Sequence, residues 1–303
     1  MRAFVRALQI ANLLALKLSF GVGLVSGAIA GWGFAEPWLL RVRRFDVHLE
    51  NLPPQASGTR VVQISDLHAG LVAPFALTRR IVELAQLQNP DVLVFTGDVV
   101  SRRGSYLPFL RGLALPVTEY ARRLQPLLRE LRAPLGVWAV PGNHDLWRGE
   151  KNELEHGDFS PVRSHLEAAN VRVLQNENAR LANGLAIIGT DDLREGNPDV
   201  RLATRGIEAH EAQLVLSHNP RLAALFADRN ALVLSGHTHG GQARLPPPLR
   251  LNPIDSISSH WQSGWRRVGR AQLYVSTGAG HVGGPFRLGV PPEIAVFTLR
   301  QLR

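Results

Sequence analysis

Five short apolar runs in this chain each end in residues that can bind a metal ion. The runs span residues 59–65, 91–95, 136–140, 213–216 and 231–234, and most are hydrophobic without interruption, as expected for strands buried on both faces. The residues that follow them are Asp66-Leu67-His68, Asp98, Asn143-His144-Asp145, His218 and His237-Thr238-His239. Because ligands of an open α/β sheet collect at the carboxyl ends of its strands, these residues are predicted to meet at one edge.

The segments around these runs indicate an α/β organisation. Further apolar runs lie at 185–188, 273–275 and 294–299. Between the first two strands, Leu77, Ile81 and Leu84 share one face of a predicted helix, and two more helices are predicted to begin at Ser160-Pro161 and Asn219-Pro220. Hydrophobic residues make up 45% of the 303, which is enough for a large core and excludes a disordered chain.

The residue types at the strand ends favour a metal site. Carboxylates and imidazoles together suit divalent Mn, Fe and Zn, and Asp-x-His and His-x-His each place two side chains on the same side of an extended segment. Taken singly, each motif is also compatible with a turn, a helix cap or a structural histidine. The occurrence of all five in one chain favours the metal site. The chain has no cysteine, which excludes thiolate-bound zinc, iron–sulfur clusters and thiol nucleophiles.

The order of these motifs, D-x-H, G-D, G-N-H-D, H and G-H-x-H, resembles the signature of the calcineurin-like metallophosphoesterase superfamily over about residues 60–299. Ser-His-Asn-Pro at 217–220, Gly-His-Thr-His-Gly-Gly-Gln at 236–242 and the apolar segment ending near Glu36-Pro37-Trp38 are similar to a bacterial membrane-associated branch. That branch includes UDP-2,3-diacylglucosamine pyrophosphatases of lipid A biosynthesis. The resemblance implies a four-layer αββα sandwich of two mixed sheets, preceded by an N-terminal apolar helix.

The resemblance also implies a centre of two divalent metal ions, Mn, Fe or Zn, with Mn favoured. Asp98 would bridge the two ions. The other ligands would be Asp66, His68 and His239 for the first ion and Asn143, His218 and His237 for the second. A hydroxide activated between the ions would attack phosphorus in line. His144 is predicted to protonate or stabilise the leaving oxygen, with Asp145 orienting its ring; the alternative is that His144 acts only as a hydrogen-bonding support.

Residues outside the motifs are expected to choose the substrate. Arg102 and Arg103 lie just after the second strand and are predicted to bind a second phosphate or a carboxylate, or to be solvated. The 101–133 insertion carries an amphipathic stripe that indicates either a packing helix or a substrate lid. Trp261 and Trp265 belong to a packing stripe, or else line an acyl-chain groove or a membrane contact.

The N-terminal segment, residues 1–44, is predicted to be distinct from a metallophosphoesterase domain at 45–303. Residues 18–35 carry no charge, and extension back to residue 10 adds only Lys17, so the stretch is long enough for a membrane-spanning helix. The alternatives are a cleaved signal peptide and a soluble packing helix. Arginines flank the stretch on both sides, and their small excess after it favours the cytoplasmic side of the inner membrane for the catalytic domain.

The expected function is that of a hydrolase, a metal-dependent phosphoesterase acting on a membrane-derived phosphodiester or pyrophosphate such as UDP-2,3-diacylglucosamine. The expected partners are a phosphorylated small molecule or lipid and the membrane. The net charge of +9 comes from scattered arginines, and no basic stripe with interleaved aromatic residues is present, so nucleic acid is not expected as a partner. The alternatives are a general phosphodiesterase or nuclease of the same superfamily, and a non-catalytic metal-stabilised membrane scaffold.

Overall fold

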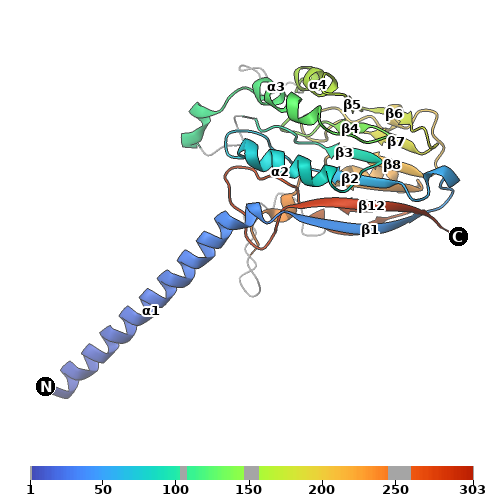
Figure 1. The fold of residues 1–303 in the computed structure, drawn as a ribbon. Helices are drawn as coiled ribbons and strands as arrows, with labels where there is room; N and C mark the ends of the chain where they lie inside the picture. Colours follow the sequence, from blue (N-terminus) through green and yellow to red (C-terminus); the bar gives the residue numbers. More distant parts are fainter. Residues whose placement is uncertain (1, 103–107, 147–156, 245–260, 303) are drawn as a thin grey trace.

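The computed structural model describes residues 2–102, 108–146, 157–244 and 261–302. These residues form two six-stranded mixed sheets, with helices on their outer faces and one long helix projecting from the domain (Figure 1). The predicted α/β sandwich with an N-terminal apolar helix is therefore confirmed.

The first sheet has the strand order β1-β12-β2-β3-β4-β5. Its strands are β1 (Arg41–Leu49), β2 (Arg60–Ile64), β3 (Val92–Thr96), β4 (Val137–Val140), β5 (Val171–Val173) and β12 (Glu293–Gln301). Only the β12–β2 pair is antiparallel. The strands β2, β3 and β4 run side by side in one direction, so the segments that follow them all begin at the same edge.

The second sheet has the order β10-β11-β9-β8-β7-β6. Its strands are β6 (Glu177–Arg180), β7 (Ala186–Gly189), β8 (Gln213–Leu216), β9 (Ala231–Ser235), β10 (Gly264–Val268) and β11 (Ala271–Val275). The four central strands are parallel and the two outer pairs antiparallel. The residues after β8 and β9 therefore also leave a common edge.

Alternation along the strands sends side chains to two sides and produces three hydrophobic clusters. The inter-sheet cluster includes Val61, Val94, Leu214, Leu234 and Phe297. The cluster on the outer face of the first sheet includes Val62, Phe95 and residues of α2 (Phe75–Gln86), α3 (Val117–Leu128) and α4 (Ser160–Glu167). The cluster outside the second sheet includes Val215, Val233 and residues of α5 (Val200–Ala203) and η5 (Pro220–Phe226). These clusters define the four predicted layers, the last of which is built from short helical segments.

The two helices expected to begin at a proline differ in detail from the prediction. The helix at Asn219-Pro220 is the 3-10 helix η5, and the Asn219 side chain accepts a hydrogen bond from Arg221 N at 3.1 Å. Helix α4 begins at Ser160, one residue earlier than a serine cap would place it. The Ser160 amide donates instead to Asp158 Oδ1 at 2.8 Å, so the carboxylate of Asp158 satisfies an amide at the start of this helix. Elsewhere in the described residues, the 3-10 helices are η1 (Glu36–Trp38), η2 (Pro54–Ala56), η4 (Pro108–Leu113) and η6 (His239–Gly241).

The described part of the 101–133 insertion contains η4 and α3. The predicted apolar stripe of α3 is buried on the first sheet, where Tyr120, Leu124 and Leu127 join the core. The packing interpretation therefore applies to α3. Helix η4 differs, because Phe109 and Leu113 are exposed.

Helix α1 (Arg2–Ala35) projects away from the sandwich (Figure 1). The stretch Leu14–Trp38, which covers most of α1 and all of η1, is long and apolar enough to cross a membrane, and none of its most apolar part is buried. The helix is therefore not a packing helix of the described domain. At its end, the Arg287 amide donates to Gly33 O at 2.9 Å and the Gly289 amide donates to the buried Glu36 carboxylate at 2.7 Å.

Candidate metal centre

Four of the five strand-end motifs meet in two clusters of side chains. The first contains Asp66, His68 and His239, and the second contains Asp98, His218 and His237. Within each cluster the candidate ligand atoms lie within 4.8 Å of one another. The prediction that these residues gather at the carboxyl ends of the strands agrees with this placement, since they follow β2, β3, β8 and β9.

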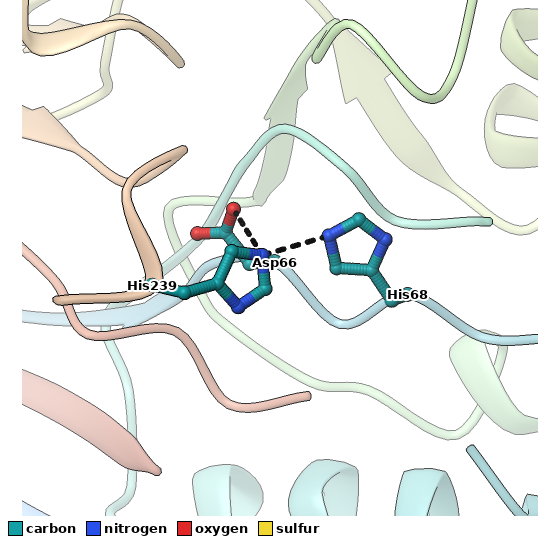
Figure 2. A group of neighbouring side chains, drawn as sticks. All are labelled: Asp66, His68 and His239. Carbon is teal, nitrogen blue, oxygen red and sulfur yellow. Dashed lines mark hydrogen bonds and ion pairs between the residues drawn. The ribbon is translucent and has the colours of Figure 1, made fainter. Parts of the chain in front are cut away.

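The first cluster is organised around the Nε2 atom of His239 (Figure 2). This atom lies 3.0 Å from Nε2 of His68 and 3.4 Å from Oδ1 of Asp66. Burial lowers the pKa of both His68 and His239 well below the usual value, so both rings are neutral near pH 7. Two neutral imidazole nitrogens facing a carboxylate form a donor set that fits a divalent cation.

The second cluster also combines a carboxylate with two imidazoles, and an amide is added. Oδ2 of Asp98 and Nδ1 of His237 each lie 3.2 Å from Nε2 of His218. The amide oxygen of Asn143 also lies 3.2 Å from this nitrogen. These oxygen and nitrogen atoms fit a second divalent cation, and the predicted second set of ligands is thus brought together.

Asp98 lies between the two clusters. Its Oδ2 is 3.2 Å from Nε2 of His218 and 3.4 Å from Nε2 of His68. Burial alone would raise the pKa of Asp98, but the neighbouring His218 holds it well below the usual range. Burial likewise would lower the pKa of His218, and Asp98 raises it instead. An ionised carboxylate between two histidine clusters is the arrangement that a bridging ligand requires.

Glycines make room for this arrangement. A side chain at Gly142 would collide with the backbone and carboxylate of Asp98, and one at Gly236 would collide with Ser65 and Asp66. The close approach of backbone to ligand explains why Gly-Asn-His-Asp and Gly-His-Thr-His begin with glycine.

His144 lies beside the first cluster, on the turn after β4. Its ring is 4.8 Å from the ring of His68, centroid to centroid, in an edge-to-face arrangement. Its backbone N–H donates to Oδ1 of Asp98 at 2.7 Å. The ring is only partly buried, and its Nδ1 atom has no hydrogen-bond partner. The ring therefore borders the centre, and no side chain of the described residues hydrogen-bonds to its Nδ1 atom.

Asp145 is bound by backbone amides. Its carboxylate accepts from Val100 N at 2.9 Å and from Gly142 N at 3.0 Å. Among the described hydrogen bonds, none joins Asp145 to the ring of His144, so the predicted orienting contact is not part of this geometry. The carboxylate instead ties the turn that carries Asn143 and His144 to the loop after β3.

Of the two predicted arginines, Arg103 lies outside the described residues. Arg102 forms an ion pair with Glu195, with Nη1 and Oε1 3.3 Å apart. This pair joins the loop after β3 in the first sheet to the turn after β7 in the second, across the edge that carries both clusters.

The turn after β7 is a part of the site that sequence reasoning missed. Asp192 is fully buried, and its Oδ2 atom has no hydrogen-bond partner. Its charge, with those of Asp98 and Asp66, offsets the effect of burial and raises the pKa of His218. Arg194 is exposed and close enough to His144 and His237 to lower the pKa of both rings, although burial is the larger cause. The signal was present, because Thr190-Asp191-Asp192 follows the apolar run 185–188 as the other motifs follow theirs.

Comparison with known proteins adds a family and relatives. The family described as Calcineurin-like phosphoesterase matches residues 59–241. The chain is 30% identical over 300 residues to the uncharacterized metallophosphoesterase YkuE of Bacillus subtilis, covering 94% of this chain and 96% of that protein. It is 28% identical over 323 residues to the UDP-2,3-diacylglucosamine pyrophosphatase LpxG of Chlamydia muridarum, covering 90% and 94%. A Danio rerio transmembrane protein with metallophosphoesterase domain is 28% identical over 295 residues, covering 92% of this chain and 62% of that protein.

Proposed function

Because the chain belongs to the calcineurin-like phosphoesterase family, we propose that it hydrolyses a membrane-derived phosphodiester or pyrophosphate such as UDP-2,3-diacylglucosamine. The observation that carries the proposal is the position of Asp98 between two histidine clusters. The similarity to LpxG, which is named for that pyrophosphate substrate, supports the choice of substrate class.

Two divalent ions are the proposed cofactors, with Mn favoured over Fe and Zn. The residues that would hold them are Asp66, His68 and His239 for one, Asn143, His218 and His237 for the other, and Asp98 for both. Bound there, the ions would polarise the phosphoryl oxygens and lower the pKa of a water molecule. The neutral state of His68 and His239 supports this role, because only the unprotonated nitrogen can bind a metal.

We propose that the side chain of His144 contacts the leaving oxygen of the substrate. The ring borders the first cluster, and its Nδ1 atom has no hydrogen-bond partner among the described residues, so the imidazole is available for the substrate. Burial lowers the pKa of His144, and the neutral ring retains one N–H that can be donated to an oxygen on which negative charge develops.

Arg102 and Arg194 are the proposed contacts to the non-reacting part of the substrate. Arg102 is held by Glu195, and Arg194 follows two residues after the buried Asp192 on the same turn. Guanidinium groups bind phosphate oxygens in a two-pronged manner, so a substrate with a second phosphate is well matched to this side of the site.

Residues 1–44 are proposed to anchor the domain 45–303 to the inner membrane. The exposed apolar stretch Leu14–Trp38 and the similarity to a protein named as transmembrane support the anchor. The arginine count on the two sides of the stretch favours a cytoplasmic domain.

The test is hydrolysis by the purified full chain in manganese. The substrates are UDP-diacylglucosamine, an aryl phosphodiester, phospholipids, nucleotides and single-stranded DNA. We expect the wild-type chain to cleave the pyrophosphate or the phosphodiester. The Asp98→Asn variant should cleave neither. Preferred cleavage of DNA would instead identify a nuclease. No cleavage by a chain that holds two equivalents of metal would indicate a scaffold.

A further inference from the structure

The edge of the sandwich that carries the metal clusters also carries exposed apolar side chains. Phe109 is 75% exposed, Leu113 67% and Phe75 47%. Phe109 and Leu113 belong to η4, and Phe75 is the first residue of α2. Leu113 and Phe75 line one cavity of about 410 Å³ together with Leu71 and Leu115. We call Phe75, Phe109 and Leu113 the apolar rim.

The apolar rim is connected to the end of α1 by a series of hydrogen bonds. The Arg287 amide donates to Gly33 O at 2.9 Å, and the Arg287 guanidinium donates to Gly280 O, with Nε and O 3.0 Å apart. The neighbouring His281 donates from Nε2 to Val72 O at 2.9 Å, three residues before Phe75. The segment after β11 thus links α1 to the loop after β2, and Figure 1 shows it between α1 and α2.

These contacts restrict how the domain can sit relative to α1. Arg287 is fully buried, and a side chain at Gly33 would collide with the ring of Phe286. The rings of Phe34 and Phe286 pack edge to face at 5.5 Å, so apolar surface continues from the helix onto the domain. In Figure 1, η4 lies on the side of the domain from which α1 extends.

We propose that the apolar rim rests on the surface of the bilayer that α1 enters. The inference rests on the proposed membrane anchoring by α1. Aromatic and aliphatic side chains inserted at the boundary of headgroups and acyl chains contribute binding in proportion to the apolar area buried. Arg79 lies with its guanidinium 5.6 Å from the ring centre of Phe75, and Arg123 lines the same cavity. Each is paired with a glutamate of its own helix, Glu83 at 3.8 Å and Glu119 at 2.8 Å, so these guanidinium groups can hydrogen-bond to headgroups but add little net charge. The edge of the sandwich that carries the metal clusters then lies next to the membrane surface.

The absence of cysteine from the chain makes a direct test possible. Single cysteines are introduced into the full chain as Phe109→Cys and Leu113→Cys, and each is labelled with bimane. The matched control is Leu87→Cys, because Leu87 is 72% exposed and follows the last residue of α2, at the opposite end from Phe75. A second control is Leu225→Cys in η5, on the outer face of the other sheet.

The labelled chains are reconstituted in vesicles of phosphatidylcholine and phosphatidylglycerol, with or without lipids that carry a spin label near the glycerol end of the acyl chain. We expect spin-labelled lipid to reduce the fluorescence at 109 and 113 by at least about twofold, since interfacial side chains lie roughly 5–10 Å into the headgroup boundary. The labels at 87 and 225 should be unaffected. Equal quenching at all four positions, or none, overturns the inference. If the fluorescence at 109 and 113 changed with the amount of protein per vesicle and not with spin-labelled lipid, the apolar rim would contact a second copy of the chain. That result would also overturn the inference.

Hydrolysis of a water-soluble aryl phosphodiester in manganese is measured on the same vesicles. Activity without quenching refutes the membrane contact and leaves the proposed function standing. Quenching without activity supports the membrane contact and counts against the proposed function. The two proposals can therefore fail separately.

Discussion

His144→Ala is the substitution that separates catalysis from metal binding most clearly. The backbone N–H of His144 donates to Asp98 at 2.7 Å, and this bond survives truncation because it does not involve the side chain. Among the described residues, the imidazole makes an edge contact with His68, and its Nδ1 atom has no hydrogen-bond partner there. The substitution therefore removes the ring while the turn and the candidate ligands keep their positions.

The expected loss follows from the role proposed for the ring. A hydrogen-bond donor aimed at an oxygen on which charge develops contributes roughly 10²–10³-fold to a rate, so kcat of His144→Ala should fall by about that factor, equivalent to about 3–4 kcal/mol of transition-state stabilisation. The loss should be smaller for an aryl ester with an acidic leaving group, because less negative charge accumulates on its leaving oxygen. His144→Gln is the matched control, since it keeps a hydrogen-bond donor but cannot transfer a proton near neutral pH.

The assay compares kcat for the two leaving groups with the metal content of each variant. We expect metal content to stay at the wild-type level in both variants, because the ring of His144 belongs to neither cluster. Equal losses for good and poor leaving groups would refute a contact with the leaving oxygen and indicate a positioning role. Loss of one equivalent of metal would refute the assignment altogether, because the ring would then be supporting a ligand.

Three further predictions follow from the site and the anchor. Asp98→Asn should bind fewer than two equivalents of manganese and lose nearly all activity, because one carboxylate serves both clusters; a normal metal count with full activity would contradict the bridging position. Arg194→Ala should raise KM for a pyrophosphate substrate by roughly tenfold or more with little change in kcat, as expected for the loss of a charged hydrogen bond. Arg205 is also exposed, and Arg205→Ala should leave KM unchanged; equal effects of the two substitutions would argue against a specific contact of Arg194. A chain that lacks residues 1–35 but keeps Glu36 and its bond to Gly289 should hydrolyse an aryl phosphodiester and leave the membrane fraction; continued sedimentation with membranes would place the anchor elsewhere.

The central strands were predictable because they are buried on both faces. β3, β8 and β9 appear in the sequence as almost continuous apolar runs, which is what two-sided burial requires, and β2 is an apolar run interrupted by the buried Gln63. The strands that the sequence did not reveal are β1, β5, β6 and β10. In β1 the exposed Arg41, Arg43 and Arg44 interrupt the pattern, because this strand lies at the edge of its sheet and has one solvated side.

Trp265 illustrates how strand pairing overrides a helical spacing. The four-residue interval between Trp261 and Trp265 suggested one stripe, but Trp265 lies in β10, opposite Tyr274 of β11. Its ring packs against Phe45, Tyr274 and Phe297 at the edge of the inter-sheet core, with centroids 5.3, 5.1 and 5.8 Å away. Trp261 packs instead against the outer cluster of the second sheet. The two residues therefore serve different layers, which only the pairing of the strands determines.

The conformation of the ligands was also beyond the reach of the sequence. Asp66, His68, Asp98, His237 and His239 all have positive φ, between 47° and 70°. Such conformations cost of order 1–3 kcal/mol each for residues other than glycine and persist only where the surroundings impose them. Here the surroundings come from both sheets. Within the first sheet, the His68 amide donates to Asp98 O at 2.9 Å. Between the first and the second sheet, the His237 amide donates to the Asp66 carboxylate at 3.0 Å. The motifs name the ligands, but their geometry depends on how the two sheets dock, so variants that disturb the inter-sheet core should lower metal affinity before they unfold the chain.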